Sequence, residues 1–583
     1  MHATTPEPDQ DALAAAAARV VADGFNSYLD RFRILTREAR THFERSDGAA
    51  VHQNPKRRLD LYGACIAQTL DAMGSILGTR TLDRERWRAV RDAYERQATA
   101  PSERELAETY FNSIVRRIFH TVGVDPAAEF VRSAAPPHRY AAPWSFTHRY
   151  EATTGVGDAL RRAFEAAGLR LPWEDLRGDA DRAAAAIDAH LRGVRAEAIE
   201  MVREPFFRGK GAYLIGQVHA GGVRHPLLLA LRNPAGRVHV DAALFLEEEL
   251  SVLFSFAHAY FFVEVTRPKE MIDYLSELLP RKPIPDLWTS IGFHRHGKTE
   301  LYRWLVRHLD TTDGRFHVAR GQRGMVMIVF ALEGFEIVFK VIRDRFPPPK
   351  SVTRQQVRDK YRLVFRHDRA GRLVDAQEFE HLVFPADRFE PALLEELATE
   401  ASESVLIRDG QVSFTHLYTE RQLIPLDIYL REAPPEPARA AVLDYGQVMR
   451  DLADTNIFPG DMLLKNFGVS RHGRVIFYDY DELCLLTDCR FRNLPAASTS
   501  EEEVASEPWY FVGENDIFPE EFQAFLGLRG ELRTSFLSKH GELLTPDFWR
   551  RAQEVHRQGL VPDIFPYPAH RRLRSADGGR DTT

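Results

Sequence analysis

The sequence predicts an α+β protein in two parts, a mostly α-helical domain over residues 1–314 and a mixed domain over residues 315–583. Apolar residues recur at a spacing near 3.6 through much of the first part, which is typical of amphipathic helices. Short apolar runs separated by Gly and Pro dominate the second part, which is typical of antiparallel strands. The turn-forming run Thr311-Thr-Asp-Gly314 marks the boundary between them.

Composition argues against several classes of protein. The 583 residues carry 77 basic and 84 acidic side chains, a formal charge of −7, whereas a nucleic-acid-binding protein should be strongly basic. The three cysteines, Cys65, Cys484 and Cys489, lack the spacing of a metal site, so we expect a reduced, cytoplasmic protein. No apolar run approaches ~18 residues and the N-terminus has no basic segment, so we expect neither a membrane span nor a signal peptide.

The first domain is expected to be a helical scaffold. Its helices should extend from about Asp11 to Glu204, and the segment Phe111–Val122 carries apolar residues on one face. Residues 212–246 change character, because short apolar runs alternate with Gly and Pro turns. These runs predict a small antiparallel meander, and a helix over residues 247–260 should follow it. The three strands of the meander are expected at residues 212–219, 226–231 and 238–240.

The segment Gly292–Thr299 fits the phosphate-binding pattern G-x-x-x-x-G-K-[ST] letter for letter. A working loop of this kind follows a buried strand, so that its backbone amides can curl around phosphate. Here the preceding residues 284–288 do not form a buried strand, and two His and one Arg crowd the loop. We therefore favour a turn between helices in which Gly297 starts or ends a helix, with a nucleotide site as the alternative.

Residues 319–342 predict a glycine-containing loop followed by a β-hairpin. The loop comprises Ala319, Arg320, Gly321, Gln322, Arg323, Gly324 and Met325. Its two glycines would let the backbone approach a phosphate, and strands are expected over residues 326–330 and 337–342. Lys340 lies among Val and Phe residues, where a buried charge needs an anionic partner. Alternatively, Lys340 points to solvent from a strand with one exposed face.

A helix is predicted over Val352–His367, with Ser351 or Thr353 as its N-cap. It offers no plain acidic partner for Lys340, since Asp359 is its only interior carboxylate. The acidic residues after the helix are the candidates for that role, namely Asp375, Glu378 and Glu380.

The next elements lead toward a polar loop. Paired strands are expected at residues 405–409 and 412–419, and a helix over residues 437–455. Between them, residues 420–426 predict a hinge whose backbone could meet an adenine base.

The stretch Asn456–Glu482 carries the functional prediction. Asp461 is followed by Asn466 and then, after a turn and a short strand, by Asp479. Protein kinases place a catalytic base and two metal ligands on the same layout. Asp461 would orient the attacking hydroxyl, while Asn466 and Asp479 would supply oxygen ligands to Mg²⁺. Lys465 could add positive charge near the transferred phosphoryl group. The alternative is a polar turn followed by an edge strand, because Asp and Asn are common in turns.

Taken together, these motifs strongly resemble the isocitrate dehydrogenase kinase/phosphatase family over the whole chain. The most distinctive stretches are Phe346-Pro-Pro-Pro-Lys350 and Ile457-Phe-Pro-Gly-Asp461. The resemblance implies a protein-kinase-like bilobal domain, with an N-lobe at about residues 315–420 and a C-lobe at about 421–570. A helical regulatory domain that binds AMP would precede it. The implied activity is the ATP-dependent phosphorylation of a serine of isocitrate dehydrogenase, which directs isocitrate into the glyoxylate bypass, and its dephosphorylation in the same site.

The resemblance also assigns roles by position. Residues 319–325 would form the ATP loop, and Lys340 would bind the phosphates. Asp461 would be the kinase base, and Asp375 the acidic residue needed for dephosphorylation. Mg²⁺ would be held by Asn466, Asp479 and Asp481.

Two other interpretations stay open. A nucleotide-binding pseudokinase or scaffold would keep the same residues without transferring phosphate, and a small-molecule kinase would use Gly292–Thr299 instead. Residues 483–508 resemble a long activation segment in which Glu501–Glu503 would be solvated. The polar residues 570–583 are expected to form a frayed tail.

Overall fold

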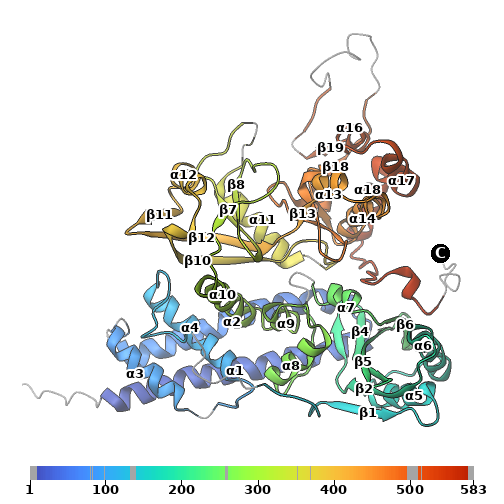
Figure 1. The fold of residues 1–583 in the computed structure, drawn as a ribbon, viewed down its shortest axis with the longest axis horizontal. Helices are drawn as coiled ribbons and strands as arrows, with labels where there is room; N and C mark the ends of the chain where they lie inside the picture. The colour runs from blue at the N-terminus through green and yellow to red at the C-terminus, as the bar shows by residue number, and fades with distance from the viewer. Residues whose placement is uncertain are drawn as a thin grey trace, which may run out of the picture. The chain divides into compact units, whose positions relative to one another are not determined.

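The computed structural model describes residues 10–78, 81, 83–97, 99–131, 139–255, 260–348, 350, 352–367, 369–495, 510–513 and 515–574. Among the described residues, 10–255, 260–311 and 567–574 form one compact unit, and 312–566 form a second (Figure 1). The predicted cap Ser351 and the acidic run Glu501–Glu503 lie outside the described residues. Within the described ranges, no helix has both the length and the apolar character needed to cross a membrane.

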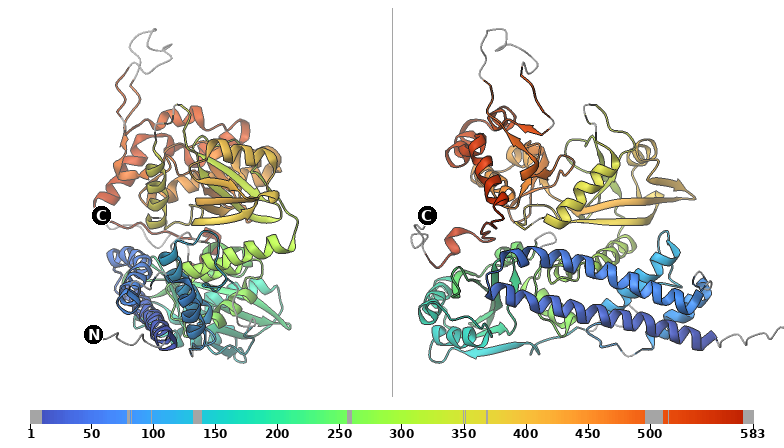
Figure 2. Two further views of the ribbon diagram at one scale, coloured as in Figure 1. Left: turned by 90° about the vertical axis from the view of Figure 1, so that its left-hand side faces the viewer. Right: turned by 180° about the vertical axis from the view of Figure 1, so that it is seen from behind.

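The first unit begins with a helical layer, as the apolar spacing predicts. Its first helices are α1 (Gln10–Glu44), α2 (Gly48–Leu77), α3 (Arg84–Glu95) and α4 (Arg104–Phe119). The long helices α1 and α2 lie side by side (Figure 2). Asp47 caps α2, because its carboxylate accepts a 2.9 Å hydrogen bond from the Ala50 amide. Tyr110 and Phe111 of α4 are fully buried in the shared apolar core.

A six-stranded antiparallel sheet completes the first unit. Its path is β1-β2-β4-β5-β6, with β3 pairing β4. The predicted meander is confirmed as β4 to β6, but the prediction of mostly helix before residue 204 missed β1 and β2. Two amphipathic helices bury their apolar faces against this sheet. The elements are β1 (Thr147–Glu151), α5 (Val156–Ala166), α6 (Leu176–Leu191), β2 (Ala196–Val202), β3 (Phe206–Arg208), β4 (Gly211–Ala220), β5 (Val223–Arg232) and β6 (His239–Leu244).

The phosphate-loop-like segment Gly292–Thr299 is a helix junction. The helices here are α7 (Glu247–Leu253), α8 (Pro268–Leu278), α9 (Ile284–Ser290) and α10 (His294–Thr311). Gly292, with φ of +97°, turns the chain from α9 into α10. A Cβ on Gly297 would lie 2.2 Å from the Thr289 hydroxyl oxygen, so this glycine permits close helix packing. His296 is buried and contacts the Thr109 hydroxyl at 2.8 Å. The predicted turn between helices is therefore confirmed, but it lies at Gly292, and Gly297 is inside the first turn of α10 rather than at its end.

The second unit begins with a larger antiparallel sheet. Its path is β10-β12-β9-β8-β7, and β11 pairs β12. The predicted hairpin is confirmed as β8–β9, and the predicted strand pair as β11–β12. Thr353 caps α11, because its hydroxyl accepts from the Gln356 amide at 3.2 Å while the Gln356 side chain accepts from the Thr353 amide at 2.7 Å. The elements are β7 (Phe316–Val318), β8 (Met327–Leu332), β9 (Phe335–Ile342), α11 (Arg354–His367), β10 (Ala376–Pro385), α12 (Pro391–Glu400), β11 (Val405–Arg408) and β12 (Gln411–Arg421).

Helices and short strands make up the rest of the second unit. The turn and strand predicted between Asn466 and Asp479 are confirmed as the hairpin β15–β16, with Gly473 at φ of +72°. Trp549 is fully buried, and its ring stacks on Phe491. The α+β class is therefore confirmed. The elements are β13 (Ile424–Pro425), α13 (Leu426–Glu432), α14 (Pro435–Asp454), β14 (Ile457–Phe458), β15 (Phe467–Val469), β16 (Val475–Phe477), β17 (Cys484–Leu485), β18 (Arg490–Phe491), β19 (Asp516–Ile517), α16 (Phe522–Phe525), α17 (Gly530–His540) and α18 (Pro546–Arg557).

The described part of the C-terminal segment is not a frayed tail, so that prediction is wrong for residues 570–574. Arg572 pairs with the fully buried carboxylate of Asp241 at 2.9 Å, and the Tyr567 hydroxyl donates to the same carboxylate at 2.6 Å. Arg574 pairs with Asp179, which has no exposed surface, at 3.0 Å. Buried carboxylates need cationic partners, and the C-terminal arginines supply them to the first unit.

Replacement of Arg572 tests this attachment. Arg572→Ala is expected to weaken it by about 1–3 kcal/mol, because the buried Asp241 loses its charged donor. Hydrogen exchange of the β6 amides should accelerate, whereas His570→Ala, which removes an exposed side chain, should leave it unchanged. Equal exchange in both variants would contradict the assigned role of Arg572.

Candidate active site

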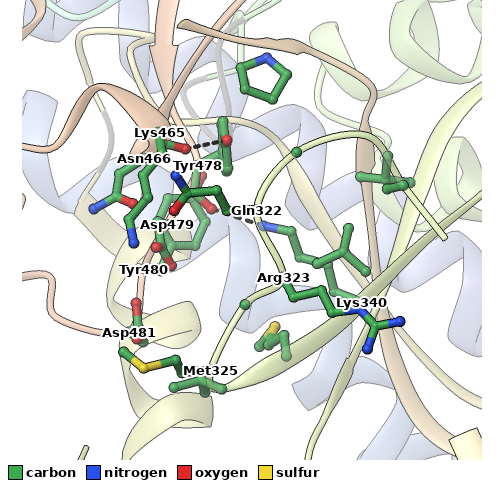
Figure 3. A pocket seen from close by; sticks show the side chains of 18 of the residues that line it. Gln322, Arg323, Met325, Lys340, Lys465, Asn466, Tyr478, Asp479, Tyr480 and Asp481 are labelled. Carbon is green, nitrogen blue, oxygen red and sulfur yellow. Dashed lines mark hydrogen bonds between the residues drawn. The ribbon is translucent and has the colours of Figure 1, made fainter. Parts of the chain in front are cut away.

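One pocket in the second unit brings together residues that are distant in sequence. It lies between the loop that precedes β8, the strand β9 and the segment from Pro459 to Glu482. Figure 3 shows Lys465, Asn466, Tyr478 and Asp479 crowded together within it. Nearly every residue that the sequence singled out lines this pocket, and Asp375 is not in its lining. The lining includes Ala319, Arg320, Gly321, Gln322, Arg323, Gly324, Met325, Lys340, Asp461, Lys465, Asn466, Asp479 and Asp481.

Lys340 lies at the centre of an ionic contact. Its ammonium group is 2.8 Å from the Glu420 carboxylate and donates to the Tyr478 carbonyl at 2.9 Å. Only 7% of the Lys340 side chain and 2% of the Glu420 side chain are exposed, so the solvent-facing alternative for Lys340 is wrong. Desolvation raises the pKa of Glu420, and the neighbouring Lys340 opposes that rise.

The prediction that Asp375, Glu378 or Glu380 pairs with Lys340 is also wrong. Glu378 instead contacts His416, at 2.6 Å. β12 lies next to β9, with Tyr418 opposite Lys340, so the second residue along β12 from Tyr418 shares a face with the lysine. That residue is Glu420. The strand pairing could have pointed to it, but the sequence pattern assigned Glu420 to the hinge. The helix α11 contributes Tyr361, whose hydroxyl donates to Glu420 at 3.2 Å.

The loop before β8 is anchored at both ends. The Ala319 amide donates to the Val329 carbonyl at 3.0 Å, which continues the hydrogen bonds between β7 and β8. Arg343 donates to the Gly324 carbonyl at 3.0 Å and is itself held by Glu396 at 2.8 Å. Gly321 has a φ of +123°, a conformation that side-chain-bearing residues rarely adopt. The loop is therefore held over the pocket while its middle keeps a glycine-dependent shape.

The segment after β14 passes very close to another segment of the same chain, at Glu482. A Cβ on Gly460, whose φ is +78°, would lie 2.7 Å from the Glu482 backbone oxygen. Asp461 follows, and its carboxylate accepts from the Leu463 amide at 3.1 Å. Asn466 donates to the Asp461 carbonyl at 3.4 Å. Desolvation and the nearby Glu482 raise the pKa of Asp461. This carboxylate thus faces the pocket in a fixed position.

Acidic groups crowd the end of β16. Desolvation and the adjacent Asp481 carboxyl raise the pKa of Asp479 well above its usual value. Lys350 pairs with Asp481 at 2.8 Å and also contacts Glu482. These contacts raise the pKa of Lys350 above its ordinary value, although desolvation opposes the rise. Lys350 is thus a pocket residue that the sequence reasoning overlooked, although it closes the distinctive Pro-Pro-Pro-Lys stretch.

The donor set suits a hard cation. Asp479 and Asp481 offer carboxylate oxygens and Asn466 a carboxamide oxygen, all in one pocket. In the part of the chain that the structure describes, no three His, Cys, Asp or Glu residues group into a complete metal site. Mg²⁺ is commonly bound through one or two carboxylates plus phosphate oxygens. The residues therefore fit a magnesium ion that shares its coordination with a nucleotide.

Asp375 is joined to this region through the backbone rather than the pocket wall. The Val374 amide donates to the Phe477 carbonyl at 3.1 Å, and the Tyr480 hydroxyl donates to the Val374 carbonyl at 2.7 Å. The Asp375 carboxylate accepts from the Gln377 side chain at 3.0 Å. Val374, the residue before Asp375, is therefore hydrogen-bonded to Phe477, which precedes Asp479, and to Tyr480, which follows it.

The buried side chain of Arg372 holds α14 against the start of β16. Arg372 donates to both carboxylate oxygens of Asp444 at 2.8 and 2.9 Å, and to Asp451 at 2.6 Å. Asp444 in turn accepts from the Val475 amide at 2.7 Å. Desolvation lowers and the two carboxylates raise the pKa of Arg372, and the net effect is a rise. The network fixes the start of β16, at whose end Asp479 lies.

Comparison with known proteins identifies the family. Residues 314–569 match the family described as "Isocitrate dehydrogenase kinase/phosphatase (AceK) kinase domain", and residues 18–313 match "Isocitrate dehydrogenase kinase/phosphatase (AceK), regulatory domain". This chain belongs to the isocitrate dehydrogenase kinase/phosphatase family. The resemblance seen in the sequence is thereby confirmed.

Two relatives are similar over nearly their whole length. An isocitrate dehydrogenase kinase/phosphatase of Anaeromyxobacter sp. (strain Fw109-5) is 49% identical, and the match covers 96% of this chain and 98% of the relative. The protein of the same name from Anaeromyxobacter dehalogenans (strain 2CP-C) is 48% identical over 97% of this chain and 99% of its own length. A kinase domain in an isocitrate dehydrogenase kinase/phosphatase implies that ATP is a ligand.

Two lysine variants distinguish the pocket from the phosphate-loop-like segment. Lys340→Ala should weaken ATP binding about 10- to 100-fold, since a hydrogen bond to a charged group contributes ~1.5–3 kcal/mol. Lys298→Ala should leave ATP binding unchanged, because Lys298 lies in α10 of the other unit. Calorimetric titration with ATP measures both. The opposite ranking would move the nucleotide site to Gly292–Thr299.

Proposed function

We propose that this chain is a bifunctional enzyme that phosphorylates and dephosphorylates a serine of isocitrate dehydrogenase, and so controls flux between the citric acid cycle and the glyoxylate bypass. The observation that carries this proposal is that Lys340, Asp461, Asn466 and Asp479 line a single pocket. The names of the two relatives support the substrate assignment. The enzyme would act in the cytoplasm, without membrane or nucleic acid.

The proposal includes a division of labour along the chain. Residues 1–314 form a regulatory domain with AMP as an allosteric ligand, and residues 315–583 a protein-kinase-like catalytic domain, whose residues 567–574 pack with the first unit. The catalytic domain is bilobal, with an N-lobe at about 315–420 and a C-lobe at about 421–570. The extents of the two family matches support this division.

The residues of the pocket divide between nucleotide and metal. The loop 319–325 covers the phosphates through its backbone, and Lys340, held by Glu420, contacts them. Asn466, Asp479 and Asp481 hold Mg²⁺, which when bound offsets the negative charge of the phosphates. Lys465 adds positive charge beside the transferred group.

Asp461 performs the proton transfer in the kinase direction. Its carboxylate accepts the hydrogen of the substrate serine and orients the serine oxygen toward the γ-phosphorus. The bond between that phosphorus and the β–γ bridging oxygen breaks as the bond between the serine oxygen and the phosphorus forms. The proton passes to Asp461, and ADP leaves. The Leu463 amide keeps the carboxylate in place throughout.

Asp375 acts in the reverse direction. With phosphoserine docked, its carboxylate positions a water molecule, whose oxygen bonds to phosphorus as the bond between the serine oxygen and phosphorus breaks and inorganic phosphate leaves. Alternatively, ADP accepts the phosphoryl group from the serine oxygen, and the ATP so formed is hydrolysed. The hydrogen bonds that join the Val374 backbone to the Phe477 carbonyl and the Tyr480 hydroxyl support a role close to Asp479. A single site would then serve both reactions with different acidic residues.

The decisive experiment is incubation with isocitrate dehydrogenase, Mg²⁺ and ATP labelled in the γ-phosphate, with Asp461→Asn as the variant. The wild-type chain should label a serine of the dehydrogenase. Asp461→Asn should lower kinase turnover by about 10²- to 10⁴-fold, the usual contribution of a positioned base, with ATP affinity nearly unchanged. ATP binding without label transfer by the wild type would favour a pseudokinase, and near-normal turnover of the variant would reject Asp461 as the base.

The release half of the same assay tests Asp375. After ATP is removed and ADP is added, the wild-type chain should release the label from the dehydrogenase. Asp375→Ala should slow this release by about 10²-fold or more while kinase turnover stays within a few-fold of wild type. Glu378→Ala is a control, because Glu378 contacts His416 on the same sheet. Equal loss of both activities in Asp375→Ala would contradict the division of labour.

A further inference from the structure

Two of the three cysteines of the chain face each other beside the pocket. The sulfur atoms of Cys484 and Cys489 are 3.5 Å apart, and neither residue is in a disulfide. Cys489 is buried with 7% exposure, whereas Cys484 is only partly buried. Cys484 follows Glu482, a pocket residue, by two positions. The third cysteine, Cys65, lies in the other unit.

The turn that carries both sulfurs is fastened to the segment that leads to Asp461. β17 pairs with β14, so that Cys484 lies opposite Phe458. The Leu486 and Thr487 amides donate to the backbone and side-chain oxygens of Asn456, each at 3.0 Å. A displacement of Cys484 would therefore act on the strand that ends two residues before Gly460.

The far side of the turn is held by α18. The side-chain amide of Gln553 donates to the carbonyls of Leu486 and Cys489, both at 2.7 Å. Because Cys489 is anchored by this buried glutamine, a bond between the sulfurs would draw Cys484 toward Cys489 rather than the reverse.

The two thiols are chemically unequal. The hydrogen bond between the two sulfurs lowers the pKa of Cys484, and the positive charge of Lys360 acts in the same direction, although desolvation opposes both. The contact with Cys484, together with desolvation, raises the pKa of Cys489. Thiolates, rather than thiols, attack peroxides, and redox-sensing cysteines are characteristically accessible and poised beside a second, resolving cysteine. Cys484 has the properties of the attacking residue and Cys489 those of the resolving one.

We propose that Cys484 and Cys489 form a reversible disulfide on exposure to hydrogen peroxide, and that this modification slows phosphoryl transfer in the adjacent pocket. The second clause rests on the proposed function; the first does not. The sulfurs need to approach from 3.5 Å to a bonded separation of about 2.05 Å.

The chemistry is balanced with peroxide as the oxidant. The Cys484 thiolate attacks one peroxide oxygen, the O–O bond breaks, and Cys484 sulfenic acid and hydroxide form. The Cys489 sulfur then attacks the Cys484 sulfur, the S–O bond breaks, and the leaving hydroxide takes a proton to become water. Two electrons pass from the sulfurs to the peroxide. A dithiol reductant reverses the change by thiol–disulfide exchange.

Mass spectrometry of the full-length chain tests the modification. No Lys or Arg lies between residues 475 and 489, so trypsin leaves both cysteines in the peptide 475–490. After treatment with hydrogen peroxide this peptide should be lighter by two hydrogen atoms, and a dithiol should restore its mass. Cys65→Ser should behave like wild type, whereas Cys484→Ser and Cys489→Ser should not lose the two hydrogens. Retention of both thiols, or over-oxidation of Cys484 without a disulfide in the wild type, would overturn the proposal.

Activity measurements test the coupling to the pocket. The oxidised wild type should transfer phosphate about fivefold or more slowly than the reduced chain, as a small displacement of the loop before Asp461 would cause. Reductant should restore the rate, and peroxide should leave Cys484→Ser unaffected, because that variant lacks the thiolate that attacks peroxide. A disulfide that forms without slowing transfer would refute the coupling. Failure of the reduced chain to phosphorylate isocitrate dehydrogenase would instead count against the proposed function, because the peptide mass does not depend on activity.

Discussion

The buried contact between Lys340 and Glu420 is the constraint on which the catalytic unit depends. A lysine in the middle of an apolar strand is tolerated only if a carboxylate meets it at close range, since an unpaired buried charge is costly. β12 supplies that carboxylate because it pairs directly with β9. The same ammonium group binds the Tyr478 carbonyl, one residue before Asp479. The Lys340 side chain therefore connects β9 and β12 of the large sheet to the segment that carries the acidic residues.

The acidic cluster explains why this part of the molecule suits phosphate chemistry. Four acidic residues line one pocket, namely Asp461, Asp479, Asp481 and Glu482. Repulsion between their carboxylates disfavours the ionised form of each. Lys350 offsets part of that charge from within the chain. A divalent cation shared with phosphate oxygens would offset more of it. The glycine at 460 matters here because any larger residue would separate the two acidic segments.

Much of the catalytic unit could be predicted because its signals are local. The β8–β9 hairpin follows from two apolar runs around a Glu-Gly turn, and the α11 cap from Thr353 with Gln356 three residues later. The partner of Lys340 could not be predicted in this way. Glu420 is 80 residues away in sequence, and only the pairing of β9 with β12 brings the two together. The attachment of Arg572 and Arg574 to buried carboxylates was likewise missed, because an arginine-rich terminus looks the same whether it is solvated or paired.

The sequence by itself determined the α+β class, the family, the glycine-containing loop over residues 319–325 and the acidic residues that line the pocket, since each depends on residue type and short spacing. Tertiary structure alone decided which charges neutralise each other. It joined Lys340 to Glu420, Lys350 to Asp481 and Asp241 to the C-terminal segment. The physical reason is that a buried charge is stabilised by whichever opposite charge the fold brings within a few ångströms, and distance along the chain does not enter that energy.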